Sequence, residues 1–257
     1  MGLNILALLG ACAIGLSLGL MGSGGSILTV PVLVYLLDQP EKIAIAGSLI
    51  IVGSIALLGS IPYIRQKLVD WPTVLLFGVP GMVGTYGGAW LSVYLSGIMQ
   101  LAIFAGVMLL ASYFMLKPKK NIEQQSDHQR HVIKIIIDGL IVGVLTGIVG
   151  VGGGFLIVPA LVLLGGLTMR VAIATSLVII ALKSFSGFVK YLDVLKESGL
   201  SLDWQIIGVM IIVGALGSTL GNKIANKVPQ DKLKKIFGLF LIIMGIYILI
   251  KSVPQLI

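Results

Sequence analysis

The second half of this chain repeats the first, and this repeat limits what the chain can fold into. When the sequence is shifted by 128 residues, residues 15–51 match residues 143–179 at 17 of 37 positions without a gap. A further shift of five residues aligns the Asp-Trp pair at 70–71 with the pair at 203–204. A repeat of this length predicts two structurally related halves within one polypeptide.

The composition predicts that both halves are embedded in a lipid bilayer. Hydrophobic residues make up 57% of the chain and charged residues 11%, where a soluble domain carries about 25% charged residues. Apolar runs of about 18–20 residues recur, and the alternation typical of strands is absent. We therefore expect an all-α polytopic membrane protein and not a β-barrel.

Each half contains five apolar segments, and the second segment of each half is short. The segments cover residues 3–20, 26–37, 43–61, 72–91 and 98–116, then 132–149, 154–166, 171–190, 204–222 and 233–251. A helix of about 12 residues spans roughly 18 Å, too little for a bilayer core of about 30 Å. These two segments are thus predicted to be re-entrant or broken helices. The predicted organisation is a first repeat at 1–116, a cytoplasmic linker at 117–131 and a second repeat at 132–257.

Positive charges between the segments predict the topology. Lys and Arg concentrate at 62–71, in the linker 117–131 and at 222–235, while the intervening connections carry fewer of them. By the positive-inside rule this places the N-terminus outside, the linker in the cytoplasm and the C-terminus outside, in a plasma (inner) membrane. Five passages per half make the halves inverted relative to each other. The net charge of +8 is explained by these loops and does not indicate nucleic-acid binding.

The chain offers little for catalysis, a metal or a cofactor. It has one cysteine, Cys12, and its two histidines, His128 and His131, both lie in the predicted linker. No His/Cys/carboxylate cluster has metal-ligand spacing, and Asp138 has no second membrane aspartate as a partner. We expect no catalytic residue, no metal and no cofactor, which argues against an intramembrane enzyme.

A Gly-rich motif occurs once in each half, at 22–26 and at 150–154. Each copy follows an apolar segment and opens a short one that contains Pro31 or Pro159. Free N–H groups at the start of a helix, together with its dipole, favour an anion. Inverted repeats with broken helices are typical of secondary transporters, which bind substrate near the midplane. The alternative is that these glycines only allow close helix packing.

Polar residues inside the segments complete the predicted site. Lys183 lies well inside an apolar segment, where a charge is costly and usually functional, unless its long side chain reaches the interface. Ser48, Thr175 and Ser176 could donate to substrate oxygens or bond back to their own helices. The predicted substrate-binding residues are Gly22, Ser23, Gly24, Gly25, Ser26, Ser48, Gly150, Gly152, Gly153, Gly154, Thr175, Ser176 and Lys183.

Four aromatic residues lie at segment ends and are predicted to anchor the protein at the two membrane interfaces. They are Trp71, Trp204, Tyr63 and Tyr191.

The paired motifs resemble those of the sulfite exporter TauE/SafE family. Both halves carry G-x-G-G-[SG]-x-[LI]-x-[VI]-P followed by A-[IV]-A-[GT]-S, at 22–31 with 44–48 and at 150–159 with 172–176. The resemblance covers the whole chain. It implies a permease for small sulfur-containing anions such as sulfite, thiosulfate or organosulfonates.

The residues and the resemblance together predict a secondary transporter that works by alternating access. Its expected partners are a small anion, the lipid bilayer and a coupling proton or other ion. An anion channel and a membrane subunit that transports nothing are the alternatives. The sequence leaves open the identity of the anion, the direction of transport, the coupling ion and the oligomeric state.

Overall fold

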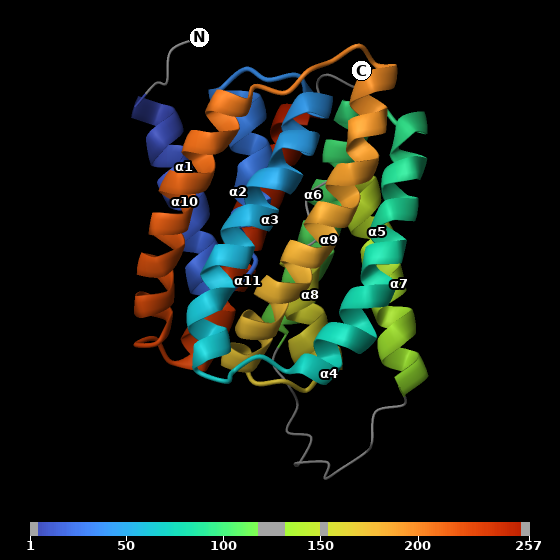
Figure 1. Ribbon diagram of the computed structural model, residues 1–257. Helices are drawn as coiled ribbons and strands as arrows, with labels where there is room; N and C mark the ends of the chain where they lie inside the picture. Colours follow the sequence, from blue (N-terminus) through green and yellow to red (C-terminus); the bar gives the residue numbers. More distant parts are fainter. Residues whose placement is uncertain (1–4, 118–131, 150–153, 253–257) are drawn as a thin grey trace.

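Every predicted apolar segment forms a helix in the computed structural model, which describes residues 5–117, 132–149 and 154–252 (Figure 1). The helices of the first half are α1 (Ile5–Met21), α2 (Gly24–Pro31), α3 (Glu41–Arg65), α4 (Trp71–Thr73), α5 (Val79–Leu91) and α6 (Gly97–Leu116). Those of the second half are α7 (Val132–Val149), α8 (Gly154–Pro159), α9 (Met169–Glu197), α10 (Trp204–Ala225) and α11 (Gln230–Ser252). Seven helices in the described part of the chain are long and apolar enough to cross a membrane. One of them, Trp71–Tyr94, joins α4, the π-helix η2 (Val74–Gly78), α5 and the 3-10 helix η3 (Ser92–Tyr94). The predicted polytopic helical membrane protein is confirmed.

The short segments are helices with a change of winding after a proline. Beyond Pro31, α2 continues as the π-helix η1 (Val32–Leu36), and beyond Pro159, α8 continues as the π-helix η4 (Ala160–Leu164). Proline lacks an N–H group and clashes with the carbonyl four residues earlier, so the regular helix is interrupted there. At 1.5 Å per residue neither unit exceeds about 20 Å, which is less than a bilayer core.

Helices of the two halves interleave, and each pairing has a counterpart in the other half. Helix α1 packs along α10, and α7 packs along α5. The third helices, α3 and α9, pack together, as do α6 with α11 and α2 with α8. Corresponding helices of the two halves are thus exchanged in the packing. Neither half forms a separately packed body.

At two helix crossings, corresponding glycines allow the backbones to approach closely. A Cβ on Gly15 of α1 would overlap the carbonyl of Gly214 of α10, and a Cβ on Gly143 of α7 would overlap the carbonyl of Gly81 of α5. Small residues allow backbones to approach this closely within a membrane. In Figure 1, α1 runs downward and α7 upward, which supports the predicted inversion.

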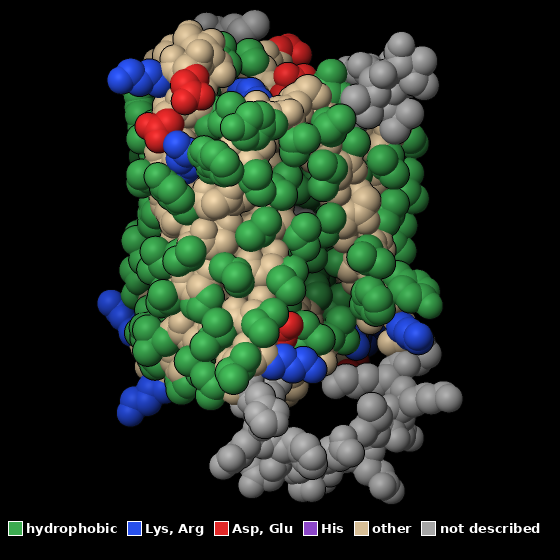
Figure 2. Space-filling model, turned by 90° about the vertical axis from the view of Figure 1, so that its right-hand side faces the viewer, with side chains coloured by type: hydrophobic (Ala, Val, Ile, Leu, Met, Phe, Trp, Pro, Cys, Tyr) green, Lys and Arg blue, Asp and Glu red, His purple; other side chains and the backbone are tan. Residues whose placement is uncertain are grey.

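On the face that Figure 2 shows, the charged side chains lie at the two ends of the bundle, with an apolar belt between them. The starts of α1 and α3 lie at one end, and the end of α6 and the start of α7 lie at the other (Figure 1). The described Lys and Arg residues of the α6–α7 end are Arg65, Lys67, Lys117, Lys134, Arg170, Lys223, Lys227, Lys232, Lys234 and Lys235. Those of the opposite end are Lys42, Lys190, Lys196 and Lys251. Ten basic residues against four give the bundle a strong charge asymmetry.

Only the tryptophans among the predicted aromatic anchors lie where an anchor belongs. Trp71 and Trp204 are 51% and 61% exposed, at the starts of their helices. The prediction is wrong for the tyrosines, because Tyr63 and Tyr191 are buried. Their hydroxyls donate to the carbonyls of Gly19 and Gly147, at 3.3 and 3.4 Å. These bonds are again related by the shift of 128 residues and tie α3 to α1 and α9 to α7.

Candidate functional site

The first Gly-rich motif forms a buried turn against α9. Gly22 has a φ of +72°, and a Cβ there would lie 2.8 Å from both the Cα of Ile173 and the Oγ of Ser176. Both the left-handed backbone and the close approach require glycine at this position. Ser176 lies seven residues into α9, so the turn is about 10 Å inside the bundle from that end.

Gly24 and Gly25 fold α2 back onto α1. A Cβ on Gly25 would lie 2.6 Å from the carbonyl oxygen of Ile14, and one on Gly24 would lie 3.1 Å from the Cβ of Ser17. These glycines therefore serve packing, as the alternative interpretation stated. They also leave the first N–H groups of α2 at a buried turn, because the first four N–H groups of a helix have no partner within it.

Most of the predicted hydroxyls are already engaged. Ser26 donates to the Ser23 carbonyl at 2.7 Å, and Ser48 donates to the Ile45 carbonyl at 2.8 Å. Ser176 donates to the carbonyls of Ile173 and Gly22, at 2.8 and 3.3 Å. A hydroxyl whose hydrogen is held this way can accept a hydrogen bond from a ligand but has no second hydrogen to donate.

Two polar side chains differ from these. Thr175 accepts a hydrogen bond from the backbone N–H of Asp70 at 3.0 Å, which ties the start of α4 to α9. Ser23 is fully buried, and its Oγ has no hydrogen-bond partner among the described residues. Of the predicted hydroxyls, Ser23 thus has a free donor at the turn.

The second Gly-rich motif is described only in part. Gly150, Gly152 and Gly153 lie outside the described residues, and Gly154 begins α8. Helix α8 contacts α2. The convergence of the two motifs on one anion therefore remains a prediction.

Lys183 occupies a narrow slot between α5 and α7. It lies at the middle of α9, fourteen residues from either end, and its side chain is fully buried. Its ammonium is 4.7 Å from the centre of the Phe77 ring. A Cβ on Gly81 would lie 2.6 Å from the Nζ of Lys183 and 3.2 Å from the carbonyl oxygen of Gly139. The lysine does not reach the surface, so it does not snorkel.

The ammonium group of Lys183 has no hydrogen-bond or ion-pair partner among the described residues. Burying an isolated ammonium is costly, and buried charges in proteins are normally paired. The nearby Phe77 ring offers only a cation–π contact. An unpaired buried cation of this kind is suited to binding an anion.

The slot of Lys183 and the Gly22 turn are two separate sites, and both involve side chains of α9. Ser176 and Lys183 are seven residues apart, so their side chains leave the same side of α9 about 10 Å from each other. The structure brings Gly22 and Ser176 together and places Lys183 further along, against α5. Phe77, Gly81 and Gly139, which wall the lysine slot, were not predicted as site residues. The alignment of Gly81 with Gly214 was the only sequence signal for them.

A corresponding slot lies between α10 and α1 and holds a different side chain. Ile55, which corresponds to Lys183, is fully buried. A Cβ on Gly214 would lie 3.1 Å from the Cγ1 of Ile55 and 3.5 Å from the carbonyl oxygen of Ala11. Gly214 and Ala11 correspond to Gly81 and Gly139. One position of the fold therefore holds an alkyl side chain in one half and an ammonium in the other.

These features define a polytopic helical membrane protein with a buried cationic site, the class to which membrane transporters belong. Residues 6–248 match the family described as sulfite exporter TauE/SafE, and the chain belongs to that family.

Several relatives align over nearly the full length of both chains. A probable membrane transporter protein of Xylella fastidiosa is 30% identical over 95% of this chain and 94% of its own. The probable membrane transporter protein YunE of Bacillus subtilis is 28% identical over 97% and 98%. One from Methanocaldococcus jannaschii is 26% identical over 92% and 93%. No solved structure matches this chain.

Proposed function

We propose that this protein is a secondary transporter that moves small sulfur-containing anions, such as sulfite, thiosulfate or organosulfonates, by alternating access. Membership of the sulfite exporter TauE/SafE family supports this substrate class. The observation that carries the proposal for this chain is the fully buried, unpaired ammonium of Lys183 at the middle of α9. An oxyanion is the ligand that would supply its missing partner.

The Gly22 turn supports the same proposal. Its candidate donors are the unpartnered hydroxyl of Ser23 and the N–H groups of Gly24 and Gly25 at the start of α2, all within the bundle. We infer that the anion contacts these donors and Lys183 in turn, because the two clusters lie along one side of α9. The predicted contributions of Gly150, Gly152, Gly153 and Gly154 would come from the other half.

The charge asymmetry supports the proposed orientation. The α6–α7 end of the bundle carries ten described basic residues and the opposite end four. By the positive-inside rule the linker 117–131 lies in the cytoplasm and both termini lie outside. The basic loops that predict an external N-terminus from the sequence also lie together at the α6–α7 end of the bundle.

The experiment uses purified full-length protein in proteoliposomes preloaded with unlabelled sulfite, and measures uptake of labelled sulfite. Uptake that is accelerated by sulfite inside the vesicles is expected, because a carrier returns faster when loaded. Uptake that does not respond to internal sulfite would favour an anion channel. Absence of uptake of sulfite, thiosulfate and taurine alike would overturn the proposal and favour a subunit that transports nothing.

A binding measurement completes the test. Sulfite is expected to raise the unfolding temperature of the wild-type protein, because a ligand of the native state stabilises it. Chloride at the same ionic strength is the control for general salt effects. The Lys183→Met variant is expected to lose the sulfite-specific shift, and an undiminished shift would remove Lys183 from the site.

A further inference from the structure

One face of α9 carries a line of polar side chains that begins at Lys183 and ends where the helix ends. Its members are Lys183, Ser186, Lys190, Asp193 and Glu197. Their spacing of three and four residues places them on a single side of the helix. Exposure increases along the line, from a fully buried Lys183 to side chains exposed by 15% at Lys190 and 57% at Asp193.

This polar face points toward α5 along its whole length. Ser186 donates to the carbonyl of Met82 at 3.1 Å, and the ammonium of Lys190 is 5.9 Å from the centre of the Tyr86 ring. At this level an open groove follows the outer side of the contact between α5 and α9; apart from Tyr86 and Ser186, its lining is apolar. Between the two lysines the helices stay in contact, since a Cβ on Gly187 of α9 would lie 2.9 Å from the Cγ2 of Thr85.

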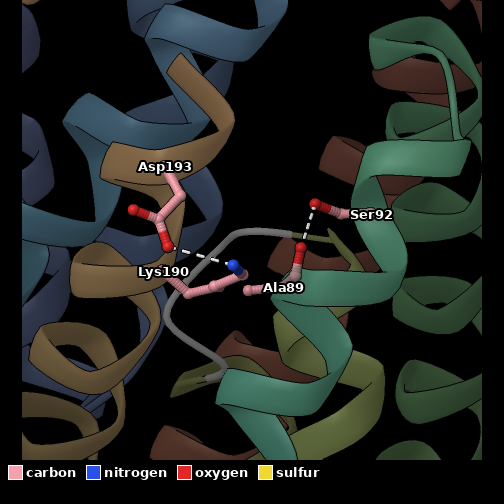
Figure 3. A network of polar contacts seen from close by, with 4 residues as sticks. All are labelled: Ala89, Ser92, Lys190 and Asp193. Carbon is pink, nitrogen blue, oxygen red and sulfur yellow. Dashed lines mark hydrogen bonds and ion pairs between the residues drawn. The ribbon is translucent and has the colours of Figure 1, made fainter. Parts of the chain in front are cut away.

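The line ends in a hollow at the end of the bundle that carries the two termini. Trp90, Val93 and Tyr94 form one wall, and Lys190, Asp193 and Glu197 are on the other. The hollow measures about 370 Å³, including space open to solvent. Figure 3 shows Lys190 extending from α9 toward the end of α5, where Ala89 lies, and the 3-10 helix η3 (Ser92–Tyr94) that follows it.

Besides the ring of Tyr86, the Lys190 ammonium contacts one carboxylate. The ammonium is 3.0 Å from a carboxylate oxygen of Asp193. Pairs of this spacing on a helix surface contribute little to stability. An incoming anion can therefore replace the carboxylate at little cost. Lys42, at the same end of the bundle, differs from Lys190. Its ammonium donates to the carbonyls of Ser92 and Leu95 at 2.8 and 2.9 Å, so its hydrogen bonds are used by the backbone that follows α5.

The other half shows that the fold does not need these polar residues. The positions on α3 and beyond that correspond to Ser186, Lys190, Asp193 and Glu197 are Leu58, Pro62, Arg65 and Val69. The related helix therefore keeps its packing with a largely apolar face. A structural requirement would apply to both halves, so the polar face of α9 calls for a different explanation.

We propose that this face of α9 is the outer half of the substrate path, and that Lys190 is a second anion-binding position which Asp193 occupies while no anion is there. The inference rests on the proposed transport of small oxyanions. Lys183 and Lys190 are seven residues apart, about 10 Å along the helix, a gap that two long lysine side chains can narrow. Asp193 and Glu197 weaken anion binding at Lys190, so the outer position releases its anion readily.

The test measures sulfite transport in proteoliposomes for three single variants with wild-type unfolding temperatures. Lys190→Gln is expected to raise KM about fivefold and leave kcat near its wild-type value, because a cation of the path is lost. Asp193→Asn is expected to lower KM about twofold, because Lys190 no longer has a competing carboxylate. Lys196→Gln is the matched control, since Lys196 lies near the same end of α9 but faces Leu200 and Trp204.

The double variant Lys190→Gln with Asp193→Asn is expected to match Lys190→Gln alone, because Asp193 acts through Lys190. An unchanged KM in Lys190→Gln would overturn the inference, and so would equal effects of Lys190→Gln and Lys196→Gln. Either result leaves the proposed function in place, provided the wild-type protein transports sulfite. A wild-type protein that moves no anion would remove both proposals together.

Discussion

The slot filled by Lys183 and the slot filled by Ile55 are built from corresponding parts of the two halves. In each, a side chain from the third long helix lies on a glycine, Gly81 or Gly214, next to a carbonyl of the first helix of a half. Both occupants are fully buried. The slots differ in one respect that matters for chemistry, because one occupant carries an ammonium group and the other carries none.

This difference separates packing from function. Ile55 shows that an alkyl side chain fills the slot, so the fold does not depend on a charge there. Lys183 therefore retains a charge at a cost in stability, which is common at functional sites. The same contrast extends along the helix, since the polar face of α9 corresponds to a largely apolar face on α3.

The largest expected effect is on sulfite transport, which should depend on the Lys183 slot and not on the Ile55 slot. Lys183→Met should lower kcat/KM for sulfite about 300-fold, because truncating one partner of a buried charge contact costs about 2–5 kcal/mol. Ile55→Met, a change of similar size in the related slot, should alter kcat/KM less than about twofold. Labelled sulfite uptake in proteoliposomes measures both. Equal losses in the two variants would mean that both slots serve packing alone.

The next effect concerns stability. Ile55→Lys should lower the free energy of unfolding by about 3 kcal/mol, because it adds an unpaired cation inside the membrane. Lys183→Met should instead raise it by about 1–3 kcal/mol, because a buried group without a partner is removed. Thermal or denaturant unfolding of both variants in mild detergent measures the two changes. A destabilised Lys183→Met would show that the ammonium has a stabilising partner.

A smaller effect comes from the glycine beneath each slot. Gly81→Ala should displace the Lys183 side chain and raise KM for sulfite, at a stability cost of about 1–3 kcal/mol. Gly214→Ala should have a similar cost in stability, because it displaces Ile55, and should leave KM unchanged. Transport kinetics and unfolding of the two variants give the comparison. A raised KM in both variants would mean that KM responds to any disturbance of helix packing and does not report on Lys183.

The smallest expected effect is on stability and concerns the two tyrosine hydrogen bonds, which are alike in the two halves. Tyr63→Phe and Tyr191→Phe each remove one hydrogen bond to a glycine carbonyl and should each cost about 1 kcal/mol. Tyr191 also accepts a hydrogen bond from Gln100 at 3.1 Å, so its variant should be the more destabilised of the two. Unfolding in mild detergent measures both losses. A larger loss for Tyr63→Phe would contradict this order.

The helices could be predicted from sequence because they follow from chain length and hydropathy. The predicted segment 132–149 matches α7, and 204–222 ends three residues before α10 does. The third segments were predicted too short, because 43–61 and 171–190 end before Tyr63 and Tyr191, which continue α3 and α9. Tyrosine near a segment end favours an interface by composition, but here each ring finds a carbonyl partner inside the bundle.

The site was predicted only in part. Lys183 stood out because a charge within an apolar run is rare, and Gly22 because its motif occurs twice. The slot walls Phe77, Gly81 and Gly139 belong to three-dimensional packing between helices distant in sequence, which no local pattern encodes. Nor does sequence reveal that the Ser176 hydroxyl is engaged with Gly22, whereas that of Ser23 is free.

The burial of one unpaired ammonium halfway along α9 has an electrical consequence. A monoanion bound to Lys183 forms a pair without net charge, so the membrane potential does no work on the loaded site. A dianion leaves one negative charge, and moving it through 100 mV changes the energy of the loaded protein by about 2.3 kcal/mol, or about 50-fold in the equilibrium between its inward-facing and outward-facing states. The voltage dependence of transport therefore reports the charge state of the anion that is carried.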